Sequence, residues 1–125
     1  MVIGIGLDLV DRTRVERALE RFGERFVGKL MDPAEAASLP GPGPERGLVL
    51  AFAVAGKEAA SKALGTGWSQ GVRWRDVVVR TGPHPSVSLH GRAAAVAKER
   101  GSSGRNRVRL SLTGTLVLGE FWLLS

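Results

Sequence analysis

The segment from residue 48 to residue 64 constrains the fold most, because it is long, rich in alanine and almost entirely apolar. It reads LVLAFAVAGKEAASKAL, in which Ala, Val, Leu and Gly leave few polar positions. Alanine is the strongest helix former, and a helix that is apolar on nearly every side belongs in a protein interior. Gly65 follows directly, and glycine is the residue that most often ends a helix. We therefore expect a long buried helix against which the rest of the chain packs.

The rest of the chain predicts strands near both ends and shorter helices between them. Alternation of apolar residues predicts strands at 2–10, 72–80, 86–89, 107–113 and 116–124, the last two forming a hairpin joined at Gly114. In the first strand, Gly4, Gly6 and Asp8 fall on one face, which leaves room for another backbone or a ligand to approach.

Helix signals follow each other after the first strand. Thr13 and Glu16 fit a capping box that opens a helix running to about residue 29, with Gly23 as a weak point. Asp32-Pro33 begins a second, short helix, and residues 91–100 form another. Residues 39–47, LPGPGPERG, predict a loop. The order β-α-α-α-β-β-α-β-β predicts an α+β fold.

Composition limits the class of protein. A chain of 125 residues with 43% apolar residues predicts one domain over residues 1–125 with a real core. Cysteine is absent, no run of about 18 apolar residues exists and the N-terminus lacks a signal-peptide pattern, so we expect a cytoplasmic protein with no membrane partner. The net charge of +6 indicates an anionic partner, and no motif supports nucleic acid.

Charged side chains on the apolar 48–64 helix mark a candidate site. Glu58 and Lys62 are four residues apart; an ordinary surface ion pair is one interpretation of that spacing. Charges on a mostly buried helix need partners, however, and Asp8 on the glycine face of the first strand is a candidate to share a cation with Glu58. Two carboxylates with phosphate oxygens and water make a typical Mg²⁺ site. Lys62 and the backbone of the turn Gly65-Thr66-Gly67 would then hold phosphate.

A second charged feature lies on the first predicted helix. At about 100° per residue, its arginines fall within about 80° of one another, beside an apolar stripe and an acidic stripe. We call Arg14, Arg17, Arg21 and Arg25 the arginine stripe. One interpretation is a solvated amphipathic helix with Glu–Arg pairs along it. The other is a docking surface for an acidic partner helix, because guanidinium groups suit carboxylates.

Four segments together form a known pattern: GIGLDLVDRTRVE at 4–16, GKEAASKALGTG at 56–67, GPHPSVSLHGRAA at 82–94 and RVRLSLTGTLVLGEFWLLS at 107–125. They resemble the holo-acyl-carrier-protein synthase family of 4′-phosphopantetheinyl transferases. The first segment is similar to the family's opening strand and metal aspartate, the second to its most diagnostic helix, and the last two to its later strands. Together they span the whole chain in the family's order.

This resemblance implies a fold, an activity and a set of site residues. The fold is phosphopantetheinyl transferase-like, in a homotrimer with sites between subunits. The activity is transfer of 4′-phosphopantetheine from coenzyme A, with Mg²⁺, to a serine of an apo acyl carrier protein. Asp8 and Glu58 are the implied metal ligands, and Asp8, Glu58 and Lys62 the catalytic set. The implied coenzyme-binding residues are Lys57, Ser61, Lys62, Gly65, Thr66, Gly67 and Thr113, and the arginine stripe suits the acidic carrier.

The chain departs from the family pattern in three places. Ala53 and Val54 stand where the family has Arg-Phe, Gly56 stands where it has Ala, and Thr113-Gly114 align with its Ser-His. An alternative function is therefore a repurposed transferase scaffold, because fold alone does not fix function. Such a scaffold would be either a non-catalytic trimer that binds a carrier protein or an enzyme acting on a small molecule in the intersubunit cleft.

Overall fold

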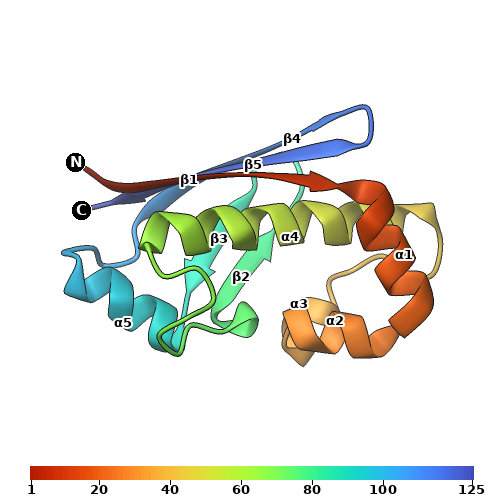
Figure 1. Ribbon diagram of the computed structural model, residues 1–125, viewed down its shortest axis with the longest axis horizontal. Coiled ribbons are helices and arrows are strands. Elements are labelled where there is room, and N and C mark those ends of the chain that lie inside the picture. Colours follow the sequence, from red (N-terminus) through yellow and green to blue (C-terminus); the bar gives the residue numbers. More distant parts are fainter.

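A computed structural model describes all residues, 1–125, as one α+β unit in which a single long helix lies across a sheet (Figure 1). The helix is α4 (Pro44–Leu64). The sheet is antiparallel with strand order β1-β5-β4, formed by β1 (Val2–Asp11), β5 (Leu116–Leu124) and β4 (Asn106–Thr113). The expected hairpin of the last two strands and the long buried helix are therefore confirmed.

Glycines let α4 lie directly on the sheet backbone. A Cβ atom at Gly4 would stand 2.2 Å from the carbonyl oxygen of Ala63, and one at Gly6 would stand 1.8 Å from that of Ala59. Gly119 of β5 would bring its Cβ 2.4 Å from the carbonyl oxygen of Ala55. Side chains would prevent this approach, so the glycine face of the first strand admits another backbone, as its sequence predicts.

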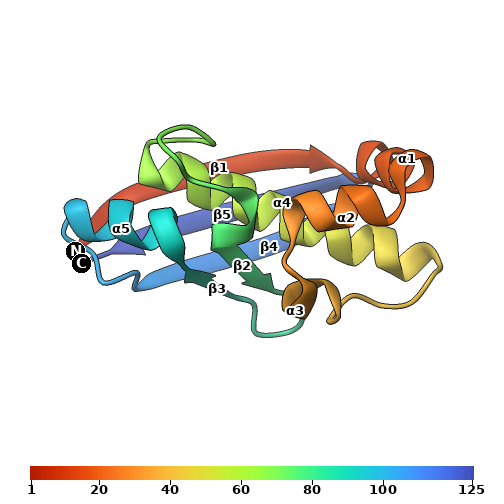
Figure 2. The same cartoon turned by 90° about the horizontal axis from the view of Figure 1, so that it is seen from below.

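A smaller layer covers the opposite side of α4 (Figure 2). It contains the antiparallel pair β2 (Val77–Arg80) and β3 (Ser86–Leu89), the 3₁₀ helix η1 (Trp74–Asp76) and α5 (Gly91–Glu99). The core lies around α4, between this smaller layer and the sheet, and side chains such as Leu50 and Phe121 are fully buried there. No helix in the structure combines the length and the apolar character needed to cross a membrane.

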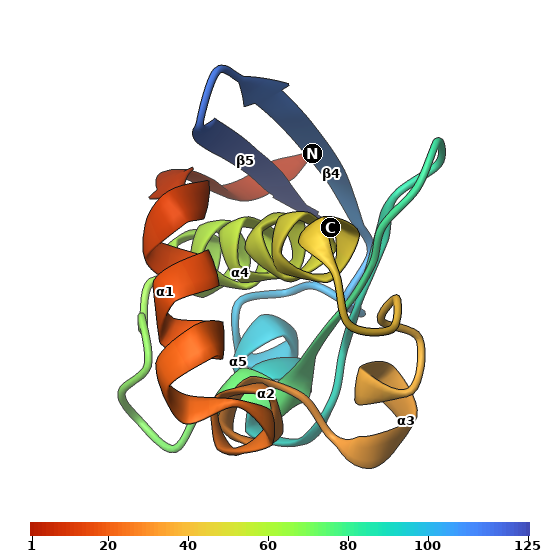
Figure 3. The same ribbon diagram turned by 90° about the vertical axis from the view of Figure 1, so that its right-hand side faces the viewer.

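Three short helices lie at one end of α4 (Figure 3): α1 (Arg12–Phe22), α2 (Glu24–Leu30) and α3 (Pro33–Ala36). Asp11 caps α1, since its Oδ1 accepts hydrogen bonds from the amide of Thr13 at 2.9 Å and from its hydroxyl at 2.7 Å. Asp32 caps α3 by accepting from the Glu35 amide at 2.8 Å, with Pro33 in the first position as predicted.

Several predicted boundaries are wrong. The helix expected over 13–29 is two helices, because Gly23 adopts φ +57°, which breaks the helix and is strained for residues with a side chain. Its cap is Asp11 and not the Thr13–Glu16 box. The strand expected over 72–80 begins only at Val77, after η1. The long helix begins at Pro44, inside the expected loop, because proline is well suited to a first helical position.

Candidate active site

Asp8 and Lys62 meet at the edge where β1 passes the C-terminal turns of α4. The Lys62 Nζ lies 2.6 Å from Asp8 Oδ1 and also donates to the Leu7 carbonyl oxygen at 3.1 Å. The Lys62 side chain is 50% exposed and that of Asp8 is 18% exposed. The lysine therefore neutralises Asp8 from the solvent side and remains accessible to an anionic ligand.

Glu58 lies one turn before Lys62 on α4, and it faces the same pair. The pKa of the Glu58 carboxyl is raised above its ordinary value, mainly because the group is partly buried. Trp68 and the positive charge of Lys62 lower this pKa, whereas the negative charge of Asp8 raises it. No cation lies within ion-pair distance of Glu58, because Lys62 pairs with Asp8 instead. One lysine thus stands near two neighbouring carboxylates and pairs only with Asp8, which leaves negative charge that a bound cation would neutralise.

This donor set fits Mg²⁺ bound together with a phosphate ligand. No group of three or more His, Cys, Asp or Glu side chains comes together in the structure, so the protein offers no complete metal cage. Mg²⁺ needs no such cage, because it commonly binds to one or two carboxylates and fills its other positions with waters and substrate phosphates. Asp8 and Glu58 are the residues that would hold it.

The turn after α4 offers fewer amides to a phosphate than its sequence predicts. The amide of Gly65 donates to the Lys62 carbonyl oxygen at 3.0 Å, and that of Gly67 donates to the Ser61 carbonyl oxygen at 3.1 Å. Both donors are therefore used to close the helix. Thr66 alone keeps an amide free of backbone bonds, although its hydroxyl donates to the Gly67 carbonyl oxygen at 2.8 Å.

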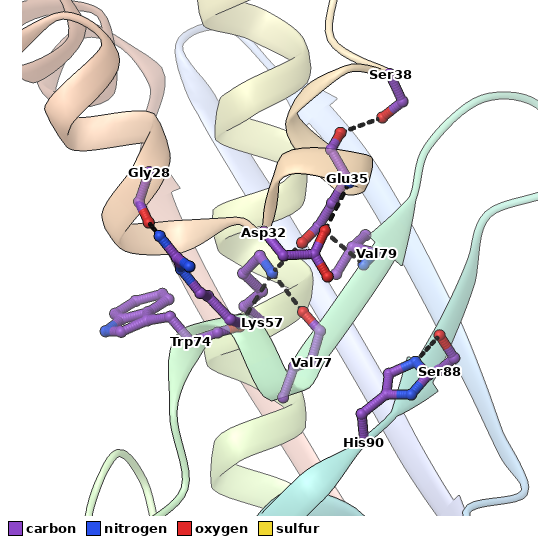
Figure 4. Close-up of polar contacts among 11 residues, drawn as sticks. Gly28, Asp32, Glu35, Ser38, Lys57, Trp74, Val77, Val79, Ser88 and His90 are labelled. Atoms are coloured by element: carbon purple, nitrogen blue, oxygen red, sulfur yellow. Dashed lines mark hydrogen bonds and ion pairs between the residues drawn. The ribbon is translucent and has the colours of Figure 1, made fainter.

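Lys57 does not join this site, which corrects its expected role in binding coenzyme A. It is fully buried on the other side of α4, where Nζ lies 2.9 Å from Glu35 Oε1 and donates to the carbonyl oxygens of Trp74, at 3.1 Å, and Val77 (Figure 4). One residue turns a helix by about 100°, so neighbours such as Lys57 and Glu58 face different surroundings. Burial lowers the pKa of Lys57, and the charge of Glu35 opposes this effect.

Ser61 and Thr113 are also apart from the pair of carboxylates. Ser61 is 1% exposed, and its hydroxyl donates to the Glu58 carbonyl oxygen at 2.8 Å, so it stabilises the helix and does not face a ligand. Thr113 is exposed at the end of β4 beside the turn at Gly114. Asp8 pairs with Gly119, whereas Thr113 pairs with Leu116 near the hairpin tip, so Thr113 lies several residues along the sheet from Asp8.

The arginine stripe is exposed at all four positions and makes no ion pair. On α1 the pair that does form joins Arg12 and Glu16 at 2.7 Å, and Glu24 of α2 pairs with Arg46 of α4 at 2.7 Å. The break at Gly23 places Arg25 on α2, apart from the other three. The interpretation of the stripe as a set of Glu–Arg pairs is therefore not supported by the observed contacts.

Two residues of this region carry no sequence signal that would have identified them. Glu35 is buried and pairs with Lys57, although it lies in a helix of only four residues. Trp68, directly after the glycine turn, lowers the pKa of Glu58 and stacks on Trp74 with ring centroids 4.0 Å apart and an interplanar angle of 21°. Contacts over such sequence distances become visible only in the fold.

Comparison with known proteins identifies the family of this chain. The family model of the 4′-phosphopantetheinyl transferase superfamily matches residues 4–113. A holo-[acyl-carrier-protein] synthase from Methylobacterium sp. is 47% identical over 127 residues, covering 99% of this chain and 93% of the relative. The crystal structure of holo-[acyl-carrier-protein] synthase from Neisseria meningitidis superposes with a TM-score of 0.84 and 30% identity, covering 100% of both chains.

A further solved structure is similar and contains a ligand. It is a holo-(acyl-carrier-protein) synthase from Bacillus anthracis in complex with CoA (3′,5′-ADP), with a TM-score of 0.67, 25% identity and coverage of 98% of this chain and 96% of that one. The fold and the family model together define an enzyme of the phosphopantetheinyl transferase class. The chain belongs to the 4′-phosphopantetheinyl transferase superfamily.

Proposed function

We propose that this enzyme transfers the 4′-phosphopantetheine arm of coenzyme A to a serine hydroxyl of an apo acyl carrier protein, in a magnesium-dependent reaction. The observation that carries the proposal is the cluster of Asp8, Glu58 and Lys62, with the Asp8–Lys62 contact at 2.6 Å. The relatives named holo-acyl-carrier-protein synthase, and the coenzyme found in one of them, support the choice of carrier and coenzyme.

In the proposed reaction the serine oxygen forms a bond to the phosphorus that carries the pantetheine arm. The bond from that phosphorus to the adenosine 3′,5′-bisphosphate leaving group breaks, and the serine proton is released to the solvent. Mg²⁺ bound at Asp8 and Glu58 would neutralise charge on the pyrophosphate. Lys62, which is half exposed, would turn its ammonium from Asp8 toward a phosphate oxygen.

We also propose that the active unit is a trimer with its sites between subunits. The support is an uncovered apolar row on the outer face of β1, where Ile5, Leu7 and Leu9 are 57%, 54% and 63% exposed. Leu116 of the neighbouring β5 is 44% exposed. Exposed apolar residues in a row mark an interaction surface, and a closed symmetric assembly would bury them. Sedimentation at micromolar concentration should give a trimer; a monomer would contradict this part of the proposal.

The carrier protein would dock on the arginine stripe. Its four guanidinium groups are exposed and lack carboxylate partners within this chain. A free basic surface attracts an acidic protein and raises the rate of encounter, an effect that salt weakens.

The metal site is tested by removing each carboxylate. We expect Asp8→Ala and Glu58→Ala each to abolish magnesium-dependent transfer and to leave the fold intact, as judged by circular dichroism. Glu20→Ala is the matched control, because Glu20 is an exposed carboxylate of α1 with no ion pair; it should retain wild-type activity. Full activity in either site variant would overturn the assignment of that residue.

A second outcome separates the transferase from a repurposed scaffold. If the wild-type chain binds apo carrier protein and transfers nothing, the chain is a repurposed scaffold. The differences from the family pattern at Ala53 and Thr113 would then explain the lost transfer activity. Ala53 is 1% exposed within α4, so it offers no group to a ligand.

A further inference from the structure

Arg100 follows α5 directly and bridges the two elements that carry the candidate active site. Its Nη1 donates a hydrogen bond to the Ala63 carbonyl oxygen in the last turn of α4, and its Nη2 donates to the Ile3 carbonyl oxygen of β1 at 2.9 Å. Arg100 is exposed, and no carboxylate lies within ion-pair distance of it. Two backbone carbonyl groups, and no acidic side chain, therefore hold this guanidinium in place.

Both acceptors lack a partner of the usual kind. The last four carbonyl groups of an α-helix have no donor inside the helix, and that of Ala63 is one of them. β1 is an edge strand of the sheet, so carbonyl groups on its outer side have no neighbouring strand to bind. The planar guanidinium of Arg100 offers several donors in one group and binds both acceptors. The contact therefore fastens the end of α4 to the free edge of β1.

Lys62 makes a bridge of the same kind further along this edge. Its Nζ donates to the Leu7 carbonyl oxygen at 3.1 Å and lies 2.6 Å from Asp8 Oδ1. Ile3 and Leu7 are four residues apart, so their carbonyl groups point to the same side of β1, because the direction of backbone groups alternates along a strand. Two cationic side chains, Lys62 and Arg100, therefore hold the free edge of β1 to the last turns of α4.

The two bridges differ in what the proposed function asks of them. Lys62 would leave Asp8 and turn toward a phosphate oxygen of the coenzyme, whereas the contacts of Arg100 would stay in place. We propose that Arg100 is a positioning residue for coenzyme binding: its guanidinium keeps β1, with Asp8, fastened to the end of α4 while Lys62 turns toward the phosphate. The inference rests on the proposed function and assigns Arg100 no contact with substrate. Without Arg100, one ammonium group would have to hold the strand edge and bind the phosphate.

Titration calorimetry of coenzyme A into the full chain, with Mg²⁺ and without carrier protein, tests this role. Arg100→Met removes both hydrogen bonds, and we expect it to weaken coenzyme A binding about tenfold, the size of effect that loss of a hydrogen bond from a charged group produces. Arg100→Lys should recover most of the affinity, because an ammonium group can also donate to two carbonyl groups. Melting curves establish that the variants fold.

Arg75→Met is the matched control. Arg75 is also an exposed arginine that donates only to a backbone carbonyl group, that of Gly28, but its contact joins η1 to α2 and touches neither β1 nor α4. The substitution removes the same charge as Arg100→Met, so its coenzyme A affinity should match the wild type. In steady-state kinetics, Arg100→Met should raise the KM for coenzyme A and leave kcat at saturating coenzyme A unchanged, a division that a general loss of stability would not produce.

A second measurement needs no ligand. If Lys62 and Arg100 share the hold on β1, each should partly replace the other, so the melting temperature of Lys62→Met/Arg100→Met should fall by more than the two single falls added together. Strict additivity would overturn the inference. Equal coenzyme A affinity of Arg100→Met and wild type would also overturn it and leave the proposed function standing, and an equal loss in Arg75→Met would assign the effect to charge and overturn it as well. A wild-type chain that binds no coenzyme A would instead overturn the proposed function, and the inference with it.

Discussion

The buried ion pair between Lys57 and Glu35 should make a large contribution to the stability of this fold, and its disruption tests the packing of α4. The two side chains are 0% and 2% exposed. Lys57 Nζ has three acceptors, while the second Glu35 oxygen accepts from the Val79 amide at 2.9 Å. Lys57→Met would leave the Glu35 charge and two carbonyl oxygens in the interior without their donor.

Removal of one partner of a buried pair costs about 3–5 kcal/mol, because the other charge stays buried and uncompensated. That is a large part of the roughly 5–15 kcal/mol by which a native domain is stable. We therefore expect Lys57→Met to lower the free energy of unfolding by about 3–5 kcal/mol. Urea unfolding followed by circular dichroism measures this change, provided that the free energy of unfolding falls with urea concentration at the same slope in the variant and the wild type.

Lys62→Met is the matched control for this prediction. Lys62 occurs on the same helix and also pairs with a carboxylate, but its side chain is 50% exposed. Ion pairs of that kind contribute about 0–1 kcal/mol. If Lys57→Met and Lys62→Met proved equally stable, the reasoning from burial would be refuted. The double variant Lys57→Met/Glu35→Leu should lose less than the two single losses added together, because it leaves neither charge unpaired.

Three further predictions concern the cap, the sheet and the arginine stripe. Hydrogen bonds from Thr13 lower the pKa of the Asp11 carboxyl in the folded state below its ordinary value of 3.8. The Asp11 cap therefore stabilises the fold above pH 3.8, and this stabilisation is lost as the pH falls through the folded pKa. In urea, wild type should lose stability over that acidic range relative to Asp11→Asn, and equal pH profiles of the two proteins would contradict this. Gly6→Ala would place a Cβ 1.8 Å from a carbonyl oxygen of α4, so its melting temperature should fall by an amount equivalent to about 1–3 kcal/mol or more; an unchanged melting temperature would show that α4 can shift. Charge reversal of Arg14 and Arg21 to Glu should weaken apo carrier binding at low salt, less so at high salt, and leave coenzyme A binding unchanged; equal carrier affinities at low salt would refute docking there.

Patterns that depend on short sequence distances predicted much of the fold. The alanine-rich helix, its end at Gly65, the closing hairpin and the cap at Asp32 all depend on a few adjacent residues, and the structure confirms them. The break at Gly23 could not be decided from sequence, because glycine is tolerated inside a helix at a modest cost and only its φ of +57° shows the break.

The candidate site was only partly accessible to the same reasoning. Asp8 was predicted to lie near Glu58, and Lys62 was predicted to hold phosphate; the ion pair between Asp8 and Lys62 was not predicted, and it forms because β1 packs against α4. The opposite direction of Lys57 could not be predicted without knowing which face of α4 meets β2. Its partner Glu35 lies 22 residues earlier in the chain, a distance that no periodic pattern covers.

Mass spectrometry of the carrier protein tests the central claim most directly. The wild-type chain, apo carrier protein, coenzyme A and Mg²⁺ are incubated together, and the carrier is weighed before and after, with a parallel sample in which a chelator removes the metal. The account predicts that the carrier gains the mass of one phosphopantetheine arm, that adenosine 3′,5′-bisphosphate appears in equal amount, and that the chelated sample stays unmodified. An unchanged carrier mass, with the same carrier preparation readily modified by another phosphopantetheinyl transferase, would contradict the account.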